Sequence, residues 1–116
     1  MRRIQSHLFG IAQGSTLLFS DYQHDGVMWT GEGAREFRQV VTFEEPFGNT
    51  PVVQLGISMW DLDHQTNQRV DLQTDMINPE GFAIVFRTWG DTRIARIRVA
   101  WTAFGEAPDD EAWSLY

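Results

Sequence analysis

The residues with the clearest chemical potential surround one tryptophan. Trp89 lies between Arg87 and Asp91, and Gly90-Asp91-Thr92 has the composition of a turn. An exposed tryptophan beside an arginine and a carboxylate suits the rim of a binding site. An ordinary turn residue, or a residue of a protein interface, is the alternative interpretation of Trp89, because tryptophan often anchors interfaces.

Two pairs of carboxylates invite a metal-binding or catalytic interpretation. Asp61 and Asp63 begin a polar segment that resembles a calcium loop, but the central glycine and the terminal glutamate of such loops are missing. This pair, like Glu44 and Glu45, could also be compared with the acid pair of a glycoside hydrolase. Neither pair has neighbours that suggest the apolar pocket of a catalytic acid. We therefore favour solvated strand connections for both.

The remaining motifs also argue against an enzyme. The histidines His7, His24 and His64 are widely spaced, so they do not form a helical metal motif. Two or three of them could still meet near a symmetry axis of an oligomer, and separate surface histidines are the alternative. The chain has no phosphate loop, nucleotide fingerprint or nucleophile elbow. We predict no catalysis, no metal and no cofactor.

Composition and charge exclude further classes of function. The 116 residues suffice for one domain, and sixteen acidic against nine basic side chains give a net charge of −7. This charge disfavours nucleic acids and anionic membranes as partners. Without cysteine, thiol chemistry and cysteine-ligated zinc are excluded.

The sequence carries no visible targeting signal. The segment after Met1-Arg2-Arg3 is interrupted by polar residues before the apolar core of a signal peptide can form, and no apolar run is long enough to span a membrane. We therefore expect no membrane insertion. The compartment is not specified by the sequence, although an extracellular or particle-surface position is favoured.

Alternation of apolar and polar residues predicts the strands that must position the residues around Trp89. The clearest strand covers residues 52–60, where Val53, Leu55, Ile57 and Met59 share one face. Further strands are predicted over residues 4–13, 37–43, 69–76, 82–87 and 94–101. No stretch has the helical period, and residues 20–35 are expected to form a long loop. The fold class is therefore all-β, a sandwich of six or seven antiparallel strands.

Two features concern the C-terminal part of the chain. The strands on either side of Gly90-Asp91-Thr92 are predicted to form a β-hairpin, with Ile97, Val99 and Trp101 as core or oligomer contacts. The composition changes at Gly105, so we assign residues 1–105 to the sandwich and residues 106–116 to an acidic tail. Its apolar end, Trp113, Leu115 and Tyr116, is predicted to dock on a partner, and a frayed terminus is the alternative.

Short motifs over residues 4–104 resemble, in order and spacing, one known domain family. They are Arg35-Glu36-Phe37, Thr42-Phe43, Pro46-Phe47, Pro51-Val52-Val53, Asn67-Gln68-Arg69-Val70, Pro79-Glu80-Gly81-Phe82 and the segment from Thr88-Trp89 to Trp101. Together they are similar to the H-type lectin domain, the family of snail agglutinins and of the C-terminal domain of slime-mould discoidins.

The resemblance implies a six-stranded antiparallel sandwich that assembles as a homotrimer and binds N-acetylgalactosamine or galactose between protomers, without catalysis. Arg69 matches the arginine that hydrogen-bonds sugar hydroxyls, and Trp89 matches the aromatic residue that packs on the sugar. Glu32 lies where an adjacent protomer of the snail lectins contributes an aspartate. Gly90 and Ala95 differ from the family, which has a histidine and a tyrosine at these positions.

Two functions are therefore predicted. The first is a carbohydrate-binding trimer that recognises a cell-surface glycan or polysaccharide through Trp89, Arg69, Glu32 and Asp91. The alternative is a structural adaptor, such as the trimeric base of a spike, fibre or phage-like particle that holds other subunits. The changed contacts, the absent export signal and the apolar tail motivate this alternative.

Overall fold

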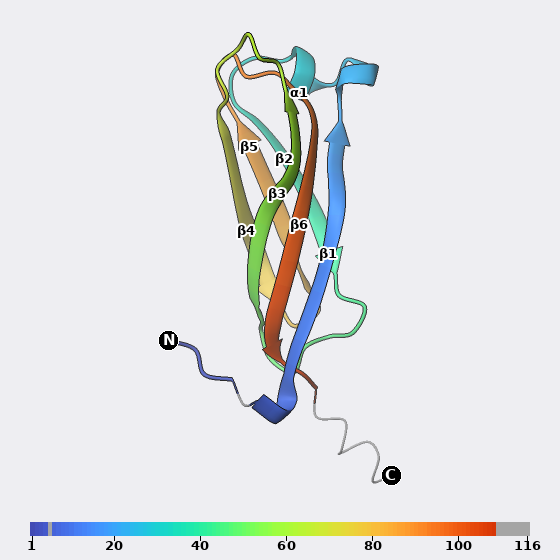
Figure 1. Cartoon of the computed structure of the whole chain (residues 1–116), viewed down its shortest axis with the longest axis vertical. Coiled ribbons are helices and arrows are strands. Elements are labelled where there is room, and N and C mark those ends of the chain that lie inside the picture. The colour runs from blue at the N-terminus through green and yellow to red at the C-terminus, as the bar shows by residue number, and fades with distance from the viewer. Residues whose placement is uncertain (5, 109–116) are drawn as a thin grey trace.

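The protein folds as two three-stranded antiparallel sheets packed face to face. The computed structural model describes residues 1–4 and 6–108 (Figure 1). One sheet has the order β1–β6–β3 and the other β2–β5–β4. The strands are β1 (Phe9–Ser20), β2 (Arg35–Thr42), β3 (Val52–Leu62), β4 (Val70–Asn78), β5 (Gly81–Thr88) and β6 (Ile94–Glu106). The all-β sandwich predicted from the sequence is confirmed, with six strands.

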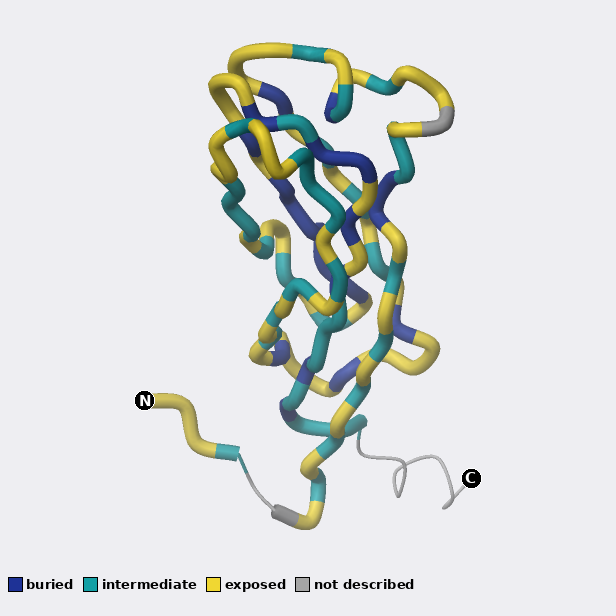
Figure 2. Tube along the Cα trace, turned by 45° about the horizontal axis from the view of Figure 1, so that its top comes forward, coloured by how far each residue is buried: buried dark blue, intermediate teal, exposed yellow. Residues whose placement is uncertain are grey.

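The core lies between the sheets and is built mainly from their two central strands. Ile84 and Phe86 of β5 and Ile97 and Val99 of β6 are fully buried, as their alternation predicts. Trp101 is partly buried and packs against this core. Figure 2 shows buried stretches running through the middle of the molecule, with mostly exposed connections at the ends. The core therefore holds the central strands in place, and the exposed connections at the ends of the sandwich can contribute residues to a binding site.

The predicted β-hairpin around Gly90 is wrong. Strand β5 pairs with β2 and β4, whereas β6 pairs with β1 and β3, so residues 89–93 cross from one sheet to the other. We call this connection the β5–β6 arch. Alternation with period two is the same for strands that pair and for strands that stack in different sheets, so it could not separate the two cases. Among the described strands, only β4 and β5 form a hairpin, through the turn at 78–81.

The first strand begins later and runs further than predicted. It covers residues 9–20 instead of 4–13, and Gly14 lies inside it. Gly14 does not end the strand because its backbone lies against the Trp101 ring, where an added Cβ would come within 2.7 Å of the ring atoms. A glycine inside a strand therefore marks a close approach here.

Two other segments differ from the prediction. Residues 20–35 contain the 3₁₀ turn η2 (Tyr22–His24) and the one-turn helix α1 (Val27–Thr30) within the expected loop, and a further 3₁₀ turn, η1 (Ser6–Leu8), precedes β1. Met76, at the end of the strand predicted over residues 69–76, is exposed with a φ of 53°. It lies where the β4–β5 pairing is irregular, between Asp75 and Asn78. This irregularity turns the side chain of Met76 outward.

The C-terminal end of the sandwich lies slightly beyond the predicted boundary. Strand β6 continues to Glu106, which pairs with Phe9, and the backbone N–H of Ala107 donates to the carbonyl of Leu8. The predicted docking residues Trp113, Leu115 and Tyr116 lie outside the described residues. Within the described part of the chain, no helix has the length and apolar character needed to cross a membrane.

Candidate functional site

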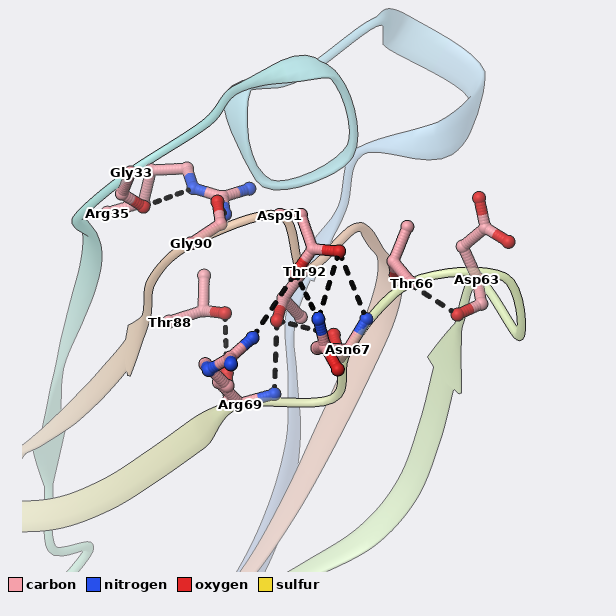
Figure 3. A network of polar contacts seen from close by, with 10 residues as sticks. All are labelled: Gly33, Arg35, Asp63, Thr66, Asn67, Arg69, Thr88, Gly90, Asp91 and Thr92. Atoms are coloured by element: carbon pink, nitrogen blue, oxygen red, sulfur yellow. Dashed lines mark hydrogen bonds and ion pairs between the residues drawn. The ribbon is translucent and has the colours of Figure 1, made fainter.

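Three connections meet at the end of the sandwich that is uppermost in Figure 1. They are residues 31–34 before β2, residues 63–69 between β3 and β4, and the β5–β6 arch. Hydrogen bonds join them to one another, and Figure 3 shows part of this network. All four residues predicted to bind sugar lie in these connections. The fold thus brings together segments that are far apart in the sequence.

Arg69 and Asp91 are in direct contact at this end. Arg69 Nη1 lies 3.3 Å from Asp91 Oδ1, and both side chains are about half exposed. Asp91 also accepts hydrogen bonds from the side-chain amide of Asn67, at 3.1 and 3.2 Å, and from its backbone N–H at 3.3 Å. These hydrogen bonds, led by that of the Asn67 amide and assisted by the charge of Arg69, hold the pKa of Asp91 below the usual aspartate value. Asp91 is therefore a carboxylate at neutral pH.

Two buried threonines fix the backbone that carries Arg69. The Thr92 hydroxyl accepts a hydrogen bond from the N–H of Arg69 at 3.0 Å and donates to the carbonyl of Asn67 at 2.6 Å. The Thr88 hydroxyl donates to the carbonyl of Arg69 at 2.5 Å. The end of β5 and the arch thus bind both backbone groups of Arg69. The guanidinium therefore projects from a fixed point of the backbone.

Gly90 lies within the arch, where the backbone conformation favours glycine. Its φ is 70°, a left-handed conformation that glycine adopts without steric cost. An added Cβ would lie 3.5 Å from Arg69 Nη1, so a larger side chain would pack on the guanidinium. The carbonyl of Gly90 accepts hydrogen bonds from the N–H of Gly33 at 2.9 Å and from Arg35 Nη2 at 3.2 Å. Gly90 therefore leaves Arg69 uncovered while it anchors residues 31–34.

Arg35 is a buried connector that the sequence did not predict. Its guanidinium donates to the carbonyls of Gly33, Met28 and Gly90. Burial lowers the pKa of Arg35, and the nearby charge of Glu32 opposes this change. An arginine nevertheless keeps its proton in a protein. Arg35 thereby ties the segment with Glu32 to the arch.

Trp89 lines a groove on the outer face of the β2–β5–β4 sheet. The ring is 44 % exposed. The groove has a volume of about 710 Å³, and its other walls include Glu36, Asp71, Gln73 and Arg87. Trp89 thus stands where the groove meets the arch that carries Asp91.

A family model for the H-type lectin domain matches residues 38–104. The chain belongs to the H-type lectin domain family. The matched region contains Arg69, Trp89 and Asp91, whereas Glu32 precedes it. The resemblance found in the sequence is therefore confirmed.

Individual relatives agree with this assignment. The chain is 58 % identical over 106 residues to ORF 7 of the ATP synthase subunits region of Fuscovulum blasticum, covering 91 % of this chain and 92 % of the relative. It is 35 % identical over 75 residues to a discoidin-1 polypeptide of Dictyostelium discoideum, covering 64 % of this chain but 30 % of the discoidin. This H-type lectin domain thus corresponds to about a third of the discoidin chain.

Solved structures show the same fold. Two structures of discoidin II from Dictyostelium discoideum superpose with TM-scores of 0.74 and 0.77, at 20 % and 18 % identity. They cover 84 % and 93 % of this chain, but 37 % and 40 % of the discoidin chains. Two antiparallel sheets in a sandwich are therefore the fold that this H-type lectin domain shares with them.

The remaining predicted residues lie apart from the Arg69–Asp91 pair. Glu32 is exposed, and its neighbour Gly33 is hydrogen-bonded to the arch. Ala95 is buried in β6, where its carbonyl accepts a hydrogen bond from the N–H of Asp21 at 2.8 Å. In this single chain Ala95 therefore does not contribute to the exposed surface around Trp89.

The carboxylates considered for other chemistry are paired or scattered. Asp61 accepts hydrogen bonds from Arg96, and Asp63 lies 3.7 Å from Arg93. Across residues 1–4 and 6–108, no three histidine or acidic side chains gather as metal ligands. Asp61, which lies within β3, and Asp63, which follows this strand, are thus ion-paired with arginines of β6 and of the arch.

Sequence reasoning missed the residues that support the site. Asn67, Thr88 and Thr92 hold Asp91 and Arg69 in place, and Arg35 anchors the arch. All four residues do lie within the motifs that carry the family resemblance, but their roles depend on contacts between distant segments. Only the crossing of the arch between sheets creates those contacts.

Proposed function

We propose that this chain is a non-catalytic carbohydrate-binding module that recognises galactose or N-acetylgalactosamine units of a surface glycan or polysaccharide. The observation that carries the proposal is the fixed, half-exposed Arg69–Asp91 pair beside the exposed ring of Trp89, in a chain of the H-type lectin domain family. These groups supply the three kinds of contact that a sugar needs. All three groups are present even though Gly90 and Ala95 differ from the residues that the family has at these positions.

Each candidate residue has a distinct role in the proposed complex. The Trp89 ring packs on the C–H face of the sugar, and Arg69 donates to a pair of adjacent hydroxyls. Asp91 orients Arg69, and a sugar hydroxyl donates to Asp91 Oδ2 in place of the longer of the two contacts that the Asn67 amide makes with this carboxylate. Glu32, from an adjacent protomer, accepts a hydrogen bond from the opposite side of the sugar. No group in this set is required to transfer a proton.

We further propose that the module works as a homotrimer. Supporting this, the outer face of the β1–β6–β3 sheet exposes large apolar side chains, namely Phe9, Ile11, Leu17 and Val52. Ile11, Phe104 and Val52 lie opposite one another in the three strands and form one apolar row. Burial of such a surface between copies is favourable in water. The trimer would also bring Glu32 of one copy to the arch of the next.

A glycan array tests the proposed function. We expect the wild-type protein to bind glycans that end in galactose or N-acetylgalactosamine, and Trp89→Ala to lose this signal. Trp89→Phe keeps an aromatic face and should retain part of it. Val40→Ala, at an exposed position on the same sheet, is the control for mutation itself. An empty array, or full binding by Trp89→Ala, would refute the proposal.

The apolar face of the β1–β6–β3 sheet also fits the second candidate function, a structural adaptor in a spike, fibre or phage-like particle. In that case the face, or the tail with Trp113, Leu115 and Tyr116, would hold other subunits. Removal of residues 109–116 leaves all six strands intact. Loss of co-purifying subunits upon this truncation, together with an empty glycan array, would favour the adaptor over the lectin.

A further inference from the structure

We infer that the groove beside Trp89 is a second sugar subsite, so that the ligand is a neutral oligosaccharide of at least two units and not a single terminal sugar. This inference rests on the proposed carbohydrate-binding function and extends the same site. It starts from the groove on the outer face of the β2–β5–β4 sheet, which none of Arg69, Asp91 and Glu32 lines. Only Trp89 belongs both to the groove and to the predicted site.

The groove has the size of a ligand site. Its volume of about 710 Å³ falls within the roughly 300–1,000 Å³ that small-molecule sites occupy. Its lining also includes Val70 and Thr88, which pair with each other one residue closer to the arch than the charged row. A surface of this kind offers an apolar patch to the ring of a sugar and polar groups to its hydroxyls.

The polar walls are already oriented for hydrogen bonding. Arg87 Nε donates to Glu36 Oε1 at 2.9 Å, and Arg87 Nη1 lies 4.0 Å from Asp71 Oδ2. Glu36, Arg87 and Asp71 lie opposite one another on neighbouring strands, so they form a row across the sheet. Gln73 Nε2 donates to Asp71 Oδ2 at 3.0 Å, which leaves the Gln73 carbonyl as an acceptor. Because these side chains hold one another, little rotamer entropy remains to be lost when a sugar binds.

The groove continues directly from the arch. Trp89 follows Arg87 by two residues in the chain, so one strand repeat of about 7 Å separates the Trp89 position from the row across the sheet. Val70 pairs with Thr88, which places Arg69 at the same end of the sheet. A chain of linked sugars that contacts Arg69 and Trp89 can therefore extend along the sheet toward Arg87.

The net charge of the row across the sheet favours neutral over anionic sugars. Arg87 stands between the carboxylates of Glu36 and Asp71, and each of these groups is about half exposed. The carboxylates outnumber the cation in this row, so an anionic sugar would meet a net negative charge. A neutral hexose, by contrast, can use both donors and acceptors of the row. The second subsite therefore favours neutral sugars.

Calorimetry with two probes tests the inference on the intact protein. The probes are methyl galactoside and a neutral tetrasaccharide that contains galactose at both terminal and internal positions. We expect the tetrasaccharide to bind about tenfold more tightly than the monosaccharide, which corresponds to about 1.4 kcal/mol. Arg87→Gln and Gln73→Ala should remove most of this difference and leave the affinity for the monosaccharide unchanged.

Arg38→Gln is the matched control, because Arg38 is also ion-paired on the outer face of this sheet but does not line the groove. Equal affinity of the two probes for the wild type, or equal effects of Arg87→Gln and Arg38→Gln, would overturn the second subsite while the lectin function stands. Absence of binding by both probes would overturn the proposed function and the inference with it. Stronger binding of a sialylated tetrasaccharide would contradict the preference for neutral sugars.

Discussion

Arg69, immediately before β4, and Asp91 in the β5–β6 arch form an ion pair of 3.3 Å that joins two connections between the sheets at one end of the sandwich. The pair lies on a surface that is half exposed, so its contribution to folding is small. The pair instead fixes the position of the Arg69 guanidinium, because Asp91 is itself held by a hydrogen bond from Asn67. The same contacts that close the end of the sandwich thus orient a hydrogen-bond donor toward solvent.

The protonation state of Asp91 predicts how sugar binding depends on pH. Hydrogen bonds from Asn67 and the charge of Arg69 lower the pKa of Asp91 in the folded protein. An unfolded aspartate has a pKa of about 3.9, and the stabilisation that the charged carboxylate provides is fully present above this pH. It is lost as the pH falls through the lower pKa that Asp91 has in the folded protein. We therefore expect constant affinity for galactose from pH 7 to about pH 4, measured by calorimetry.

Asp91→Asn is the control for this pH dependence. The variant should bind more weakly at neutral pH, and its affinity should not fall further through the pH range in which the wild type loses binding. A wild-type affinity that already falls between pH 7 and pH 5 would contradict the assigned role of Asp91.

Gly90→Ala should destabilise the fold by about 1 kcal/mol, because alanine at positive φ pays a steric cost that glycine does not. Gly56→Ala is the matched control. Gly56 is exposed in β3, its φ is not in the left-handed range, and an added Cβ meets no neighbouring atom within 4 Å. Urea unfolding of both variants measures the difference. Equal stability of the two would show that the arch does not require a left-handed residue.

Thr92→Val should cost about 1–3 kcal/mol of stability, because the Arg69 N–H and the Asn67 carbonyl then lose their partner in a buried position. It should also weaken sugar binding, since Arg69 is no longer fixed. Thr42→Val, at an exposed position in β2, has the same change of side chain without such contacts and should be close to neutral. Thermal unfolding and calorimetry on both variants would show whether the two effects appear together.

Ile11→Glu tests the proposed trimer. Ile11 is 64 % exposed at the β1 end of the apolar row on the β1–β6–β3 sheet, so a carboxylate there would be buried without a partner in the trimer. Sedimentation velocity should report a trimer for the wild type and a monomer for Ile11→Glu. Val40→Glu, at an exposed position of the opposite sheet, should remain trimeric. A wild-type monomer would refute the trimer.

The sequence predicts which segments form strands better than it predicts which strands pair with one another. The alternation in residues 52–60 and 94–101 identifies strands whose apolar residues face the core, because this pattern depends only on which face is buried. Which strands pair depends on the whole fold. Residues 82–86 are all apolar and all buried in the central strand of their sheet, but this pattern does not identify the strands that pair with them.

The candidate site could be predicted only in part for the same reason. Arg69, Trp89 and Asp91 are recognisable by residue type and by the family resemblance. The buried hydroxyl of Thr92 and the guanidinium of Arg35 have no local signal, because their partners are distant in the chain. Gly90 illustrates the limit most clearly. In the sequence, glycine in place of the family's histidine removes a side chain that could contact the sugar. In the fold, its left-handed φ and the hydrogen bonds to its carbonyl hold the arch together.

The most direct test of sugar binding at the arch is a titration of ¹⁵N-labelled protein with methyl galactoside, followed through the indole N–H signals of the five tryptophans. Each signal can be assigned by a single Trp→Phe variant. We predict that the Trp89 signal shifts in a saturable manner, while Trp60 on the opposite sheet and Trp101 at the core keep their positions. A titration that leaves Trp89 unchanged, or that shifts Trp60 or Trp101 instead, would contradict a sugar site beside Arg69 and Asp91.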